Sequence, residues 1–144
     1  MSTLVSPVYT GTLNGKQLRF FKAPTDEPHL VCHAWDDLVA CASLPQDMRE
    51  HFRQSLREDY RDAVRTVATA EGIVTIAPHW MAQGFIGSMI ECKRMPPSAE
   101  LAYTAQSVDA WNALTANLSD RQGMDLFIAA FRNTNGIGAN GGAA

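Results

Sequence analysis

The dipeptide Asn14-Gly15 is the feature that most constrains how this chain can fold. Asparagine and glycine tolerate positive φ angles, which a two-residue type I′ turn requires at both positions. The flanking segments 8–13 and 17–22 are rich in the β-branched and aromatic residues that favour strands. The sequence therefore predicts a β-hairpin over residues 8–22, and any fold of this chain must accommodate it.

Three further segments have the composition of strands. Residues 29–33 predict a third short strand, because Leu, Val and Cys lie between two histidines there. Residues 62–69 and 73–77 are rich in valine and isoleucine and are separated by Glu71-Gly72. That dipeptide is a plausible turn, so these two segments predict a second hairpin.

Five helices are predicted from apolar residues that recur every three or four positions. Prolines suit the first turn of a helix, and serine or aspartate suits the cap before it. The expected helices begin at Trp35, Pro45, Pro78, Ser98 and Ser119-Asp120, and the second reaches about Arg61. The faces expected to be buried in the last two are Leu101, Ala105, Val108, Trp111, Thr115 and Leu118, and Met124, Phe127, Ile128 and Phe131.

The element order β-β-β-α-α-β-β-α-α-α predicts an α+β fold. We expect a small antiparallel sheet of hairpins packed against several helices, with a helical C-terminal half. A chain of 144 residues is the size of one domain. We place a single globular domain at residues 3–132 and a flexible Gly/Asn/Ala tail at residues 133–144, which hold four of the ten glycines.

The cysteines and the apolar segments indicate a cytoplasmic location. The N-terminal residues lack the basic and apolar regions of a signal peptide, and no apolar run approaches the ~18 residues that cross a membrane. Cys32, Cys41 and Cys92 are widely spaced and odd in number, which favours reduced thiols. We therefore expect no membrane partner.

The sequence contains no catalytic signature, and we expect a protein that is not an enzyme and needs no cofactor. A metal site at His29, Cys32 and His33 would lack the second pair of ligands typical of zinc, and alternation on a strand would point Cys32 away from both histidines. We therefore expect no metal. An enzyme would have to rest on His33, His79 and Cys92, residues that spacing alone does not bring together.

The arginines form the most suggestive pattern. Arg49, Arg53, Arg57, Arg61 and Arg65 recur every four residues, which would place them along one flank of a helix. Guanidinium groups bind phosphate or carboxylate through paired hydrogen bonds. The same segment is rich in acidic residues, so the ridge could bind an anionic partner or could be neutralised by its neighbours. Arg53 with Glu50, and Arg57 or Arg61 with Glu58, are the expected neutralising pairs.

A second cationic group lies on the first hairpin, at Lys16, Arg19 and Lys22. A basic β-ribbon can enter a nucleic-acid groove, although charges on an edge strand also guard against aggregation. The net charge is −3, so any nucleic-acid contact must come from a local patch. The residues expected to contact DNA or another anionic partner are Lys16, Arg19, Lys22, Arg49, Arg53, Arg57 and Arg61.

Two segments carry a resemblance to a known family. The first is Asn14-Gly15-Lys16-Gln17-Leu18-Arg19-Phe20 with Pro28-His29-Leu30-Val31 and Asp36-Asp37-Leu38, and the second runs from Val74-Thr75-Ile76-Ala77-Pro78 to Lys93-Arg94-Met95-Pro96. Over residues 11–115 the chain resembles the N-terminal domain of the Bro/phage-antirepressor family. The resemblance implies a phage-like or prophage-derived regulator that binds DNA or sequesters a repressor. The positions it matches are Arg19, Asp37, Lys93 and Arg94.

These observations favour a phage-like regulatory protein that is not catalytic and binds DNA or a DNA-bound regulator. The alternative is an inhibitor or adaptor of the antirepressor type that binds a protein and does not touch nucleic acid. The two amphipathic C-terminal helices could pair across a homodimer or pack within one chain.

Overall fold

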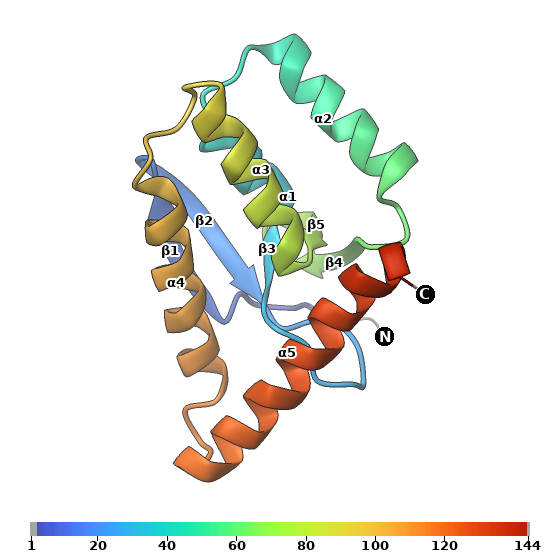
Figure 1. Ribbon diagram of the computed structural model, residues 1–144, viewed down its shortest axis with the longest axis vertical. Coiled ribbons are helices and arrows are strands. Elements are labelled where there is room, and N and C mark those ends of the chain that lie inside the picture. Colours follow the sequence, from blue (N-terminus) through green and yellow to red (C-terminus); the bar gives the residue numbers. More distant parts are fainter. Residues whose placement is uncertain (1–2, 144) are drawn as a thin grey trace.

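The computed structural model describes the backbone of residues 3–143 and the side chains of residues 3–134. The described residues form five strands and five helices in the predicted order, which confirms an α+β fold with a helical C-terminal half. In chain order the elements are β1 (Tyr9–Leu13), β2 (Lys16–Phe21), β3 (Cys32–Ala34), α1 (Trp35–Ala40), α2 (Gln46–Asp59), β4 (Arg65–Thr69), β5 (Gly72–Ala77), α3 (His79–Glu91), α4 (Ala99–Leu114) and α5 (Asp120–Ala143). Figure 1 shows the sheet with α3, α4 and α5 around it and α2 set apart.

The five strands form one antiparallel sheet in the order β1-β2-β3-β5-β4. Asn14 and Gly15 have φ angles of 52° and 80°, which confirms the predicted turn between β1 and β2. The second hairpin, β4-β5, is also confirmed, with Gly72 at a φ of 122°.

The short strand β3 joins the two hairpins. It covers three residues instead of the predicted 29–33, because its pairing with β2 involves only Cys32 and His33 and its pairing with β5 only His33 and Ala34. His33 pairs with Phe20 on one side and Ala77 on the other, so it lies at the centre of the sheet. Its ring is completely buried.

The main core lies on the face of the sheet that α1, α3 and α4 cover. Leu18 and Phe20 of β2 pack there with Leu38 of α1, Ile86 of α3 and Tyr103 of α4, all essentially inaccessible to water. Apolar burial of this kind contributes roughly 25 cal/mol per Å² and is the main stabilising effect in the fold.

A smaller cluster covers the other face of the sheet. Phe21, Ile76 and Val67 are buried there, and Val5 of the N-terminal segment packs against them. The backbone N–H of Val5 donates a 2.8 Å hydrogen bond to the Ala68 carbonyl of β4. The N-terminal segment is thereby fixed to the edge strand and helps to cover this face.

The predicted buried faces of the last two helices are wrong. In α4 the buried residues are Ala99, Tyr103 and Ala110, whereas Leu101 and Val108 are 76% and 51% exposed. The small Ala110 lets α4 approach the sheet, and Tyr103 packs its ring on Phe20 at 5.7 Å.

In α5 the residues expected to be buried are largely exposed: Met124, Phe127, Ile128 and Phe131. Apolar residues occur on more than one side of both helices, so periodicity alone does not select the inner side.

Polar contacts fix α5 at its N-terminus and again at Asn133 and Thr134. Ser119 and Gln122 cap the N-terminus reciprocally: the Gln122 N–H donates to Ser119 Oγ, and the Ser119 N–H donates to Gln122 Oε1. Further along, Asn133 Nδ2 donates to the Pro28 carbonyl at 2.7 Å, and Thr134 Oγ1 accepts from the Leu30 N–H at 2.9 Å. The helix continues to Ala143, through most of the segment for which we expect a flexible tail.

Within residues 3–143, no helix combines the length and the apolar character that crossing a membrane demands.

Candidate functional site

Arg19, expected to contact an anionic partner, is held inside the protein by Asp37. Its Nε and Nη2 donate to the two carboxylate oxygens at 2.8 and 3.0 Å, and its backbone N–H donates to Oδ2 at 3.1 Å. Both side chains are about one-seventh exposed. Hydrogen bonding to Asp37 raises the pKa of Arg19. This pair joins β2 to α1 and leaves little of the guanidinium for another molecule.

The first two arginines of the predicted ridge are engaged by neighbouring side chains. Arg53 forms a 2.6 Å ion pair with Glu50 and lies 3.7 Å from Asp36 of α1. Arg49 donates through Nη2 to Gln46 at 2.9 Å. The predicted neutralisation of Arg53 by Glu50 is therefore confirmed, and Arg53 also links α2 to Asp36 of α1.

The ridge does not continue along one helix as predicted. The helix α2 ends at Asp59, so Arg61 lies in the following turn and Arg65 begins β4, where strand pairing with β5 replaces the helical spacing. Arg57 and Arg61 are exposed and form no ion pair within 4.0 Å among the described residues. The pairing with Glu58 that the sequence suggested is absent from this part of the chain.

Lys16 and Lys22 are exposed, but they lie at opposite ends of β2. Six residues of extended chain span roughly 20 Å, and the intervening Arg19 is bound to Asp37. The hairpin therefore does not present its three cations as one compact patch.

Of the residues considered for catalysis, His33, His79 and Cys92, only His33 and His79 come close in the described residues, because both pack against the ring of Tyr103. His79 begins α3 and Cys92 follows its end, which separates them by roughly 20 Å along the helix axis. His33 is buried in the sheet, where desolvation lowers its pKa to about 3. No three His, Cys, Asp or Glu side chains are grouped for a metal ion anywhere in the described residues.

One small cavity does bring a histidine and a cysteine together. His29 and Cys32 line a space of about 100 Å³ beside Arg65. Burial raises the pKa of the Cys32 thiol to about 12, so the sulfur stays protonated at neutral pH. A protonated thiol is a poor nucleophile and a poor metal ligand, and the space accepts only a few water molecules.

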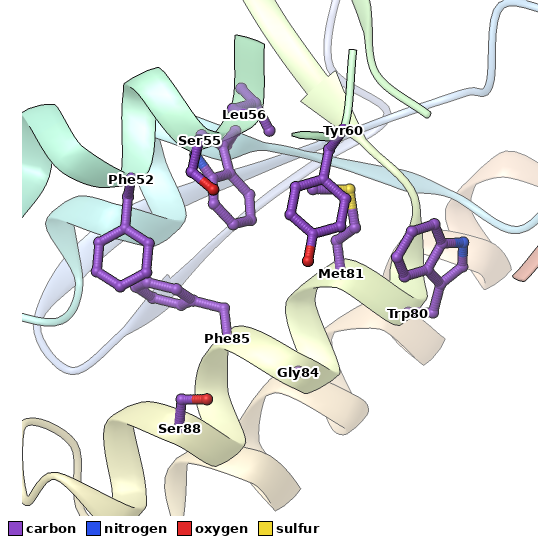
Figure 2. A pocket seen from close by; sticks show the side chains of 10 residues that line it. Phe52, Ser55, Leu56, Tyr60, Trp80, Met81, Gly84, Phe85 and Ser88 are labelled. Carbon is purple, nitrogen blue, oxygen red and sulfur yellow. The ribbon is translucent and has the colours of Figure 1, made fainter. Parts of the chain in front are cut away.

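A larger cleft, lined by aromatic rings, lies between α2 and α3. Its volume is about 420 Å³, which is within the range of ligand-binding pockets. The lining side chains are mostly aromatic or aliphatic: Trp35, Phe52, Ser55, Leu56, Tyr60, Trp80, Met81, Gly84, Phe85 and Ser88. Figure 2 shows Phe52, Leu56 and Tyr60 facing Trp80, Met81 and Phe85 across the cleft.

The rings of the cleft support one another in edge-to-face contacts. The ring centroids of Phe52 and Phe85 are 5.2 Å apart with planes at 83°, and those of Trp35 and Phe85 are 5.5 Å apart at 65°. Such pairs are favoured by the electrostatics of aromatic rings. Gly84 lies on the wall of α3, where an added Cβ would meet no atom within 4 Å. The cleft is therefore a preformed apolar surface with room above Gly84.

A few polar groups lie among the rings. Trp35 is 95% buried, and its indole nitrogen has no hydrogen-bond partner in the described residues. An indole N–H requires an acceptor, and leaving it unpaired costs about 1–3 kcal/mol. At the α2 side, Ser55 Oγ donates to Asp59 at 2.9 Å, so a carboxylate lies beside a lining hydroxyl.

The helix α2 is attached to the rest of the molecule by few buried groups. Leu56 is its only fully buried residue, and Phe52 contributes a partly buried ring. Figure 1 shows α2 standing away from the sheet, with α3 between it and α4. The wall that α2 contributes to the cleft is consequently the one with the least packing to hold it.

The cleft was not among the sites predicted from the sequence, and Met81 and Phe85 on its α3 wall also belong to the main core. A signal was present: Trp80, Gly84 and Ser88 repeat every four residues, which places a residue without a side chain on one stripe of α3. A glycine costs about 1 kcal/mol relative to alanine within a helix. Its position on an apolar stripe indicates a surface that is left open.

Comparison with known proteins found no matching family model, and neither a curated protein nor a solved structure matches the chain at a significant level.

Proposed function

We propose that this protein is a non-catalytic regulator that binds a protein partner through the aromatic cleft between α2 and α3. The observation that carries the proposal is the cleft itself, an apolar space of about 420 Å³ lined by aromatic rings. Aromatic pockets of this kind accept a bulky side chain of a partner, and such anchors supply most of the binding energy at interfaces.

The arginines favour a protein partner over DNA. Three of the seven predicted contact residues, Arg19, Arg49 and Arg53, are engaged by other side chains of the same chain. The net charge of −3 opposes approach to a polyanion. The resemblance to the Bro/phage-antirepressor family is consistent with this proposal, since it implies a regulator that can sequester a repressor. A DNA-bound regulator is the class of partner that we propose.

Filling the cleft with Gly84→Leu is expected to abolish partner binding without unfolding the protein. The position is open and leucine favours helix, so folding should be preserved or improved. The measurement uses a random peptide library displayed on phage, panned against the wild-type protein and sequenced for enriched peptides. We expect peptides with a bulky apolar residue, whose affinity falls at least tenfold for Gly84→Leu.

Gly87→Leu is the matched control, because Gly87 is in the same helix, is equally open to a side chain, and does not line the cleft. It should bind the enriched peptides like the wild type. Equal binding of these peptides by Gly84→Leu, or no enrichment at all, would contradict the proposal.

DNA binding is a second candidate function, favoured by one observation: the exposed Arg57 and Arg61 have no ion pair among the described residues. If they contact phosphates, the affinity for duplex DNA should fall steeply with salt. The double substitution Arg57→Gln with Arg61→Gln should then reduce the slope of log K against log salt by about 2, because each contact contributes about 0.9.

The control for the DNA experiment is Arg49→Gln with Arg53→Gln, which removes the same charge from guanidinium groups that are already engaged. This control should leave most of the salt dependence intact. A wild-type affinity that does not change with salt would exclude DNA as the partner.

A further inference from the structure

The outer face of α5 carries four large apolar side chains that the rest of the described chain covers only in part. Met124, Phe127, Ile128 and Phe131 are 59%, 39%, 47% and 51% exposed. At 100° per residue, these four positions form one stripe along the helix. Apolar residues scattered singly are normal on a surface, but a continuous stripe marks an interaction site.

The helix is held in place through one flank of this stripe. Ala130 and Thr134 are buried against the body, and Thr134 Oγ1 accepts the hydrogen bond from Leu30. Phe127 also meets Trp111 of α4 edge to face, with ring centroids 5.8 Å apart. Turning α5 to bury the stripe would break these contacts, so the stripe faces outward in the folded monomer.

The stripe continues into a groove beside it. Phe127 and Phe131 line a cavity of about 370 Å³ together with Val108 and Trp111 of α4. Val108 is itself half exposed. The apolar surface therefore extends from α5 onto α4.

Charges along α5 indicate what kind of partner covers this apolar surface. Arg121, Asp125 and Arg132 lie on one flank of the apolar stripe, while the opposite flank carries the buried Ala130. When two copies of a helix pair antiparallel about a two-fold axis, the same flank of each meets the other. Asp125 of one copy then lies opposite Arg132 of the second, and the axis repeats this pair.

We propose that α5 pairs antiparallel with α5 of a second copy of this chain, forming a two-fold homodimer. A second copy of α5 offers both an apolar stripe and the complementary charges along one flank. A parallel pairing would place the charged flank against Ala130 and leave its charges without partners. This inference is independent of the cleft between α2 and α3, whose walls contain no residue of α5.

Ile128→Glu is expected to raise the dimer dissociation constant at least tenfold, because it places a carboxylate near the two-fold axis. The measurement is sedimentation equilibrium of the full chain from about 1 to 100 µM, a range that separates stable from weak dimers. Ile128 is exposed in the monomer, so the variant should keep the wild-type circular dichroism spectrum. A wild-type protein that stays monomeric throughout, or an unchanged dimer in Ile128→Glu, would overturn the proposal.

A charge exchange tests the antiparallel pairing. Asp125→Arg and Arg132→Asp should each weaken the dimer about tenfold, since every single change puts two like-charged pairs across the axis. The double variant Asp125→Arg with Arg132→Asp should restore wild-type association. Glu91→Arg, at the exposed end of α3, is the control and should leave the dissociation constant unchanged. Failure of the double variant to restore association would show that another partner or another arrangement covers the stripe, and would refute the antiparallel homodimer.

Discussion

Replacing Asp37 by asparagine is expected to lower the free energy of unfolding by about 3 kcal/mol. The carboxylate accepts three hydrogen bonds from Arg19, and both side chains are only about one-seventh exposed. Asparagine keeps the volume but removes the charge, so the Arg19 guanidinium is left partly buried without its counter-ion. Urea unfolding at neutral pH measures the loss.

Asp36→Asn is the matched control for this experiment. Asp36 is the neighbouring residue of α1, is 62% exposed, and lies 3.7 Å from Arg53. An exposed ion pair of this kind contributes at most about 1 kcal/mol, so the control should be nearly neutral. Equal losses for the two variants would mean that the pair of Arg19 and Asp37 does not stabilise the junction between β2 and α1.

A second large effect is expected from acid. Burial lowers the pKa of His33 from about 6.5 to about 3, with a smaller contribution from the nearby His79. The unfolded chain binds a proton at His33 below pH 6.5, whereas the folded protein does not until pH 3. The stability that neutral His33 contributes is therefore complete above pH 6.5 and is lost as the pH falls. Between pH 7 and pH 5 the free energy of unfolding should decrease by about 2 kcal/mol from this residue.

The variant His33→Leu tests the origin of this dependence, because leucine does not titrate. Both ring nitrogens of His33 lack a hydrogen-bond partner in the described residues, so the substitution removes no polar contact among them. Urea unfolding at pH 5 and pH 7 should show a difference that is about 2 kcal/mol smaller than in the wild type. The exposed His51→Gln serves as control and should retain the full difference. A wild-type pH dependence in His33→Leu would assign the acid sensitivity to other groups.

The arginine ridge was predicted only in part from the sequence. Spacing of four residues predicts a shared helical flank, and this holds from Arg49 to Arg57. Beyond Asp59 the same spacing continues in the sequence, but pairing of β4 with β5 takes the chain out of the helix. The partner of Arg19 lies 18 residues away in α1, a contact that no spacing rule predicts. The sequence predicted the local pairing of Arg53 with Glu50 but not the pairing of Arg19 with Asp37.

The kinds and the order of the helices and strands could be predicted from the sequence, because the signals for them act within a few residues. Asn14 and Gly15 adopt the φ angles of their turn, and Ser119 and Gln122 cap α5 wherever that helix packs. The buried sides of α4 and α5 and the position of the aromatic cleft are set by tertiary packing and could not be predicted in this way. Those outcomes depend on how elements far apart in the chain approach one another, and an apolar residue has the same local preference whether it faces the core, a cleft or a second molecule.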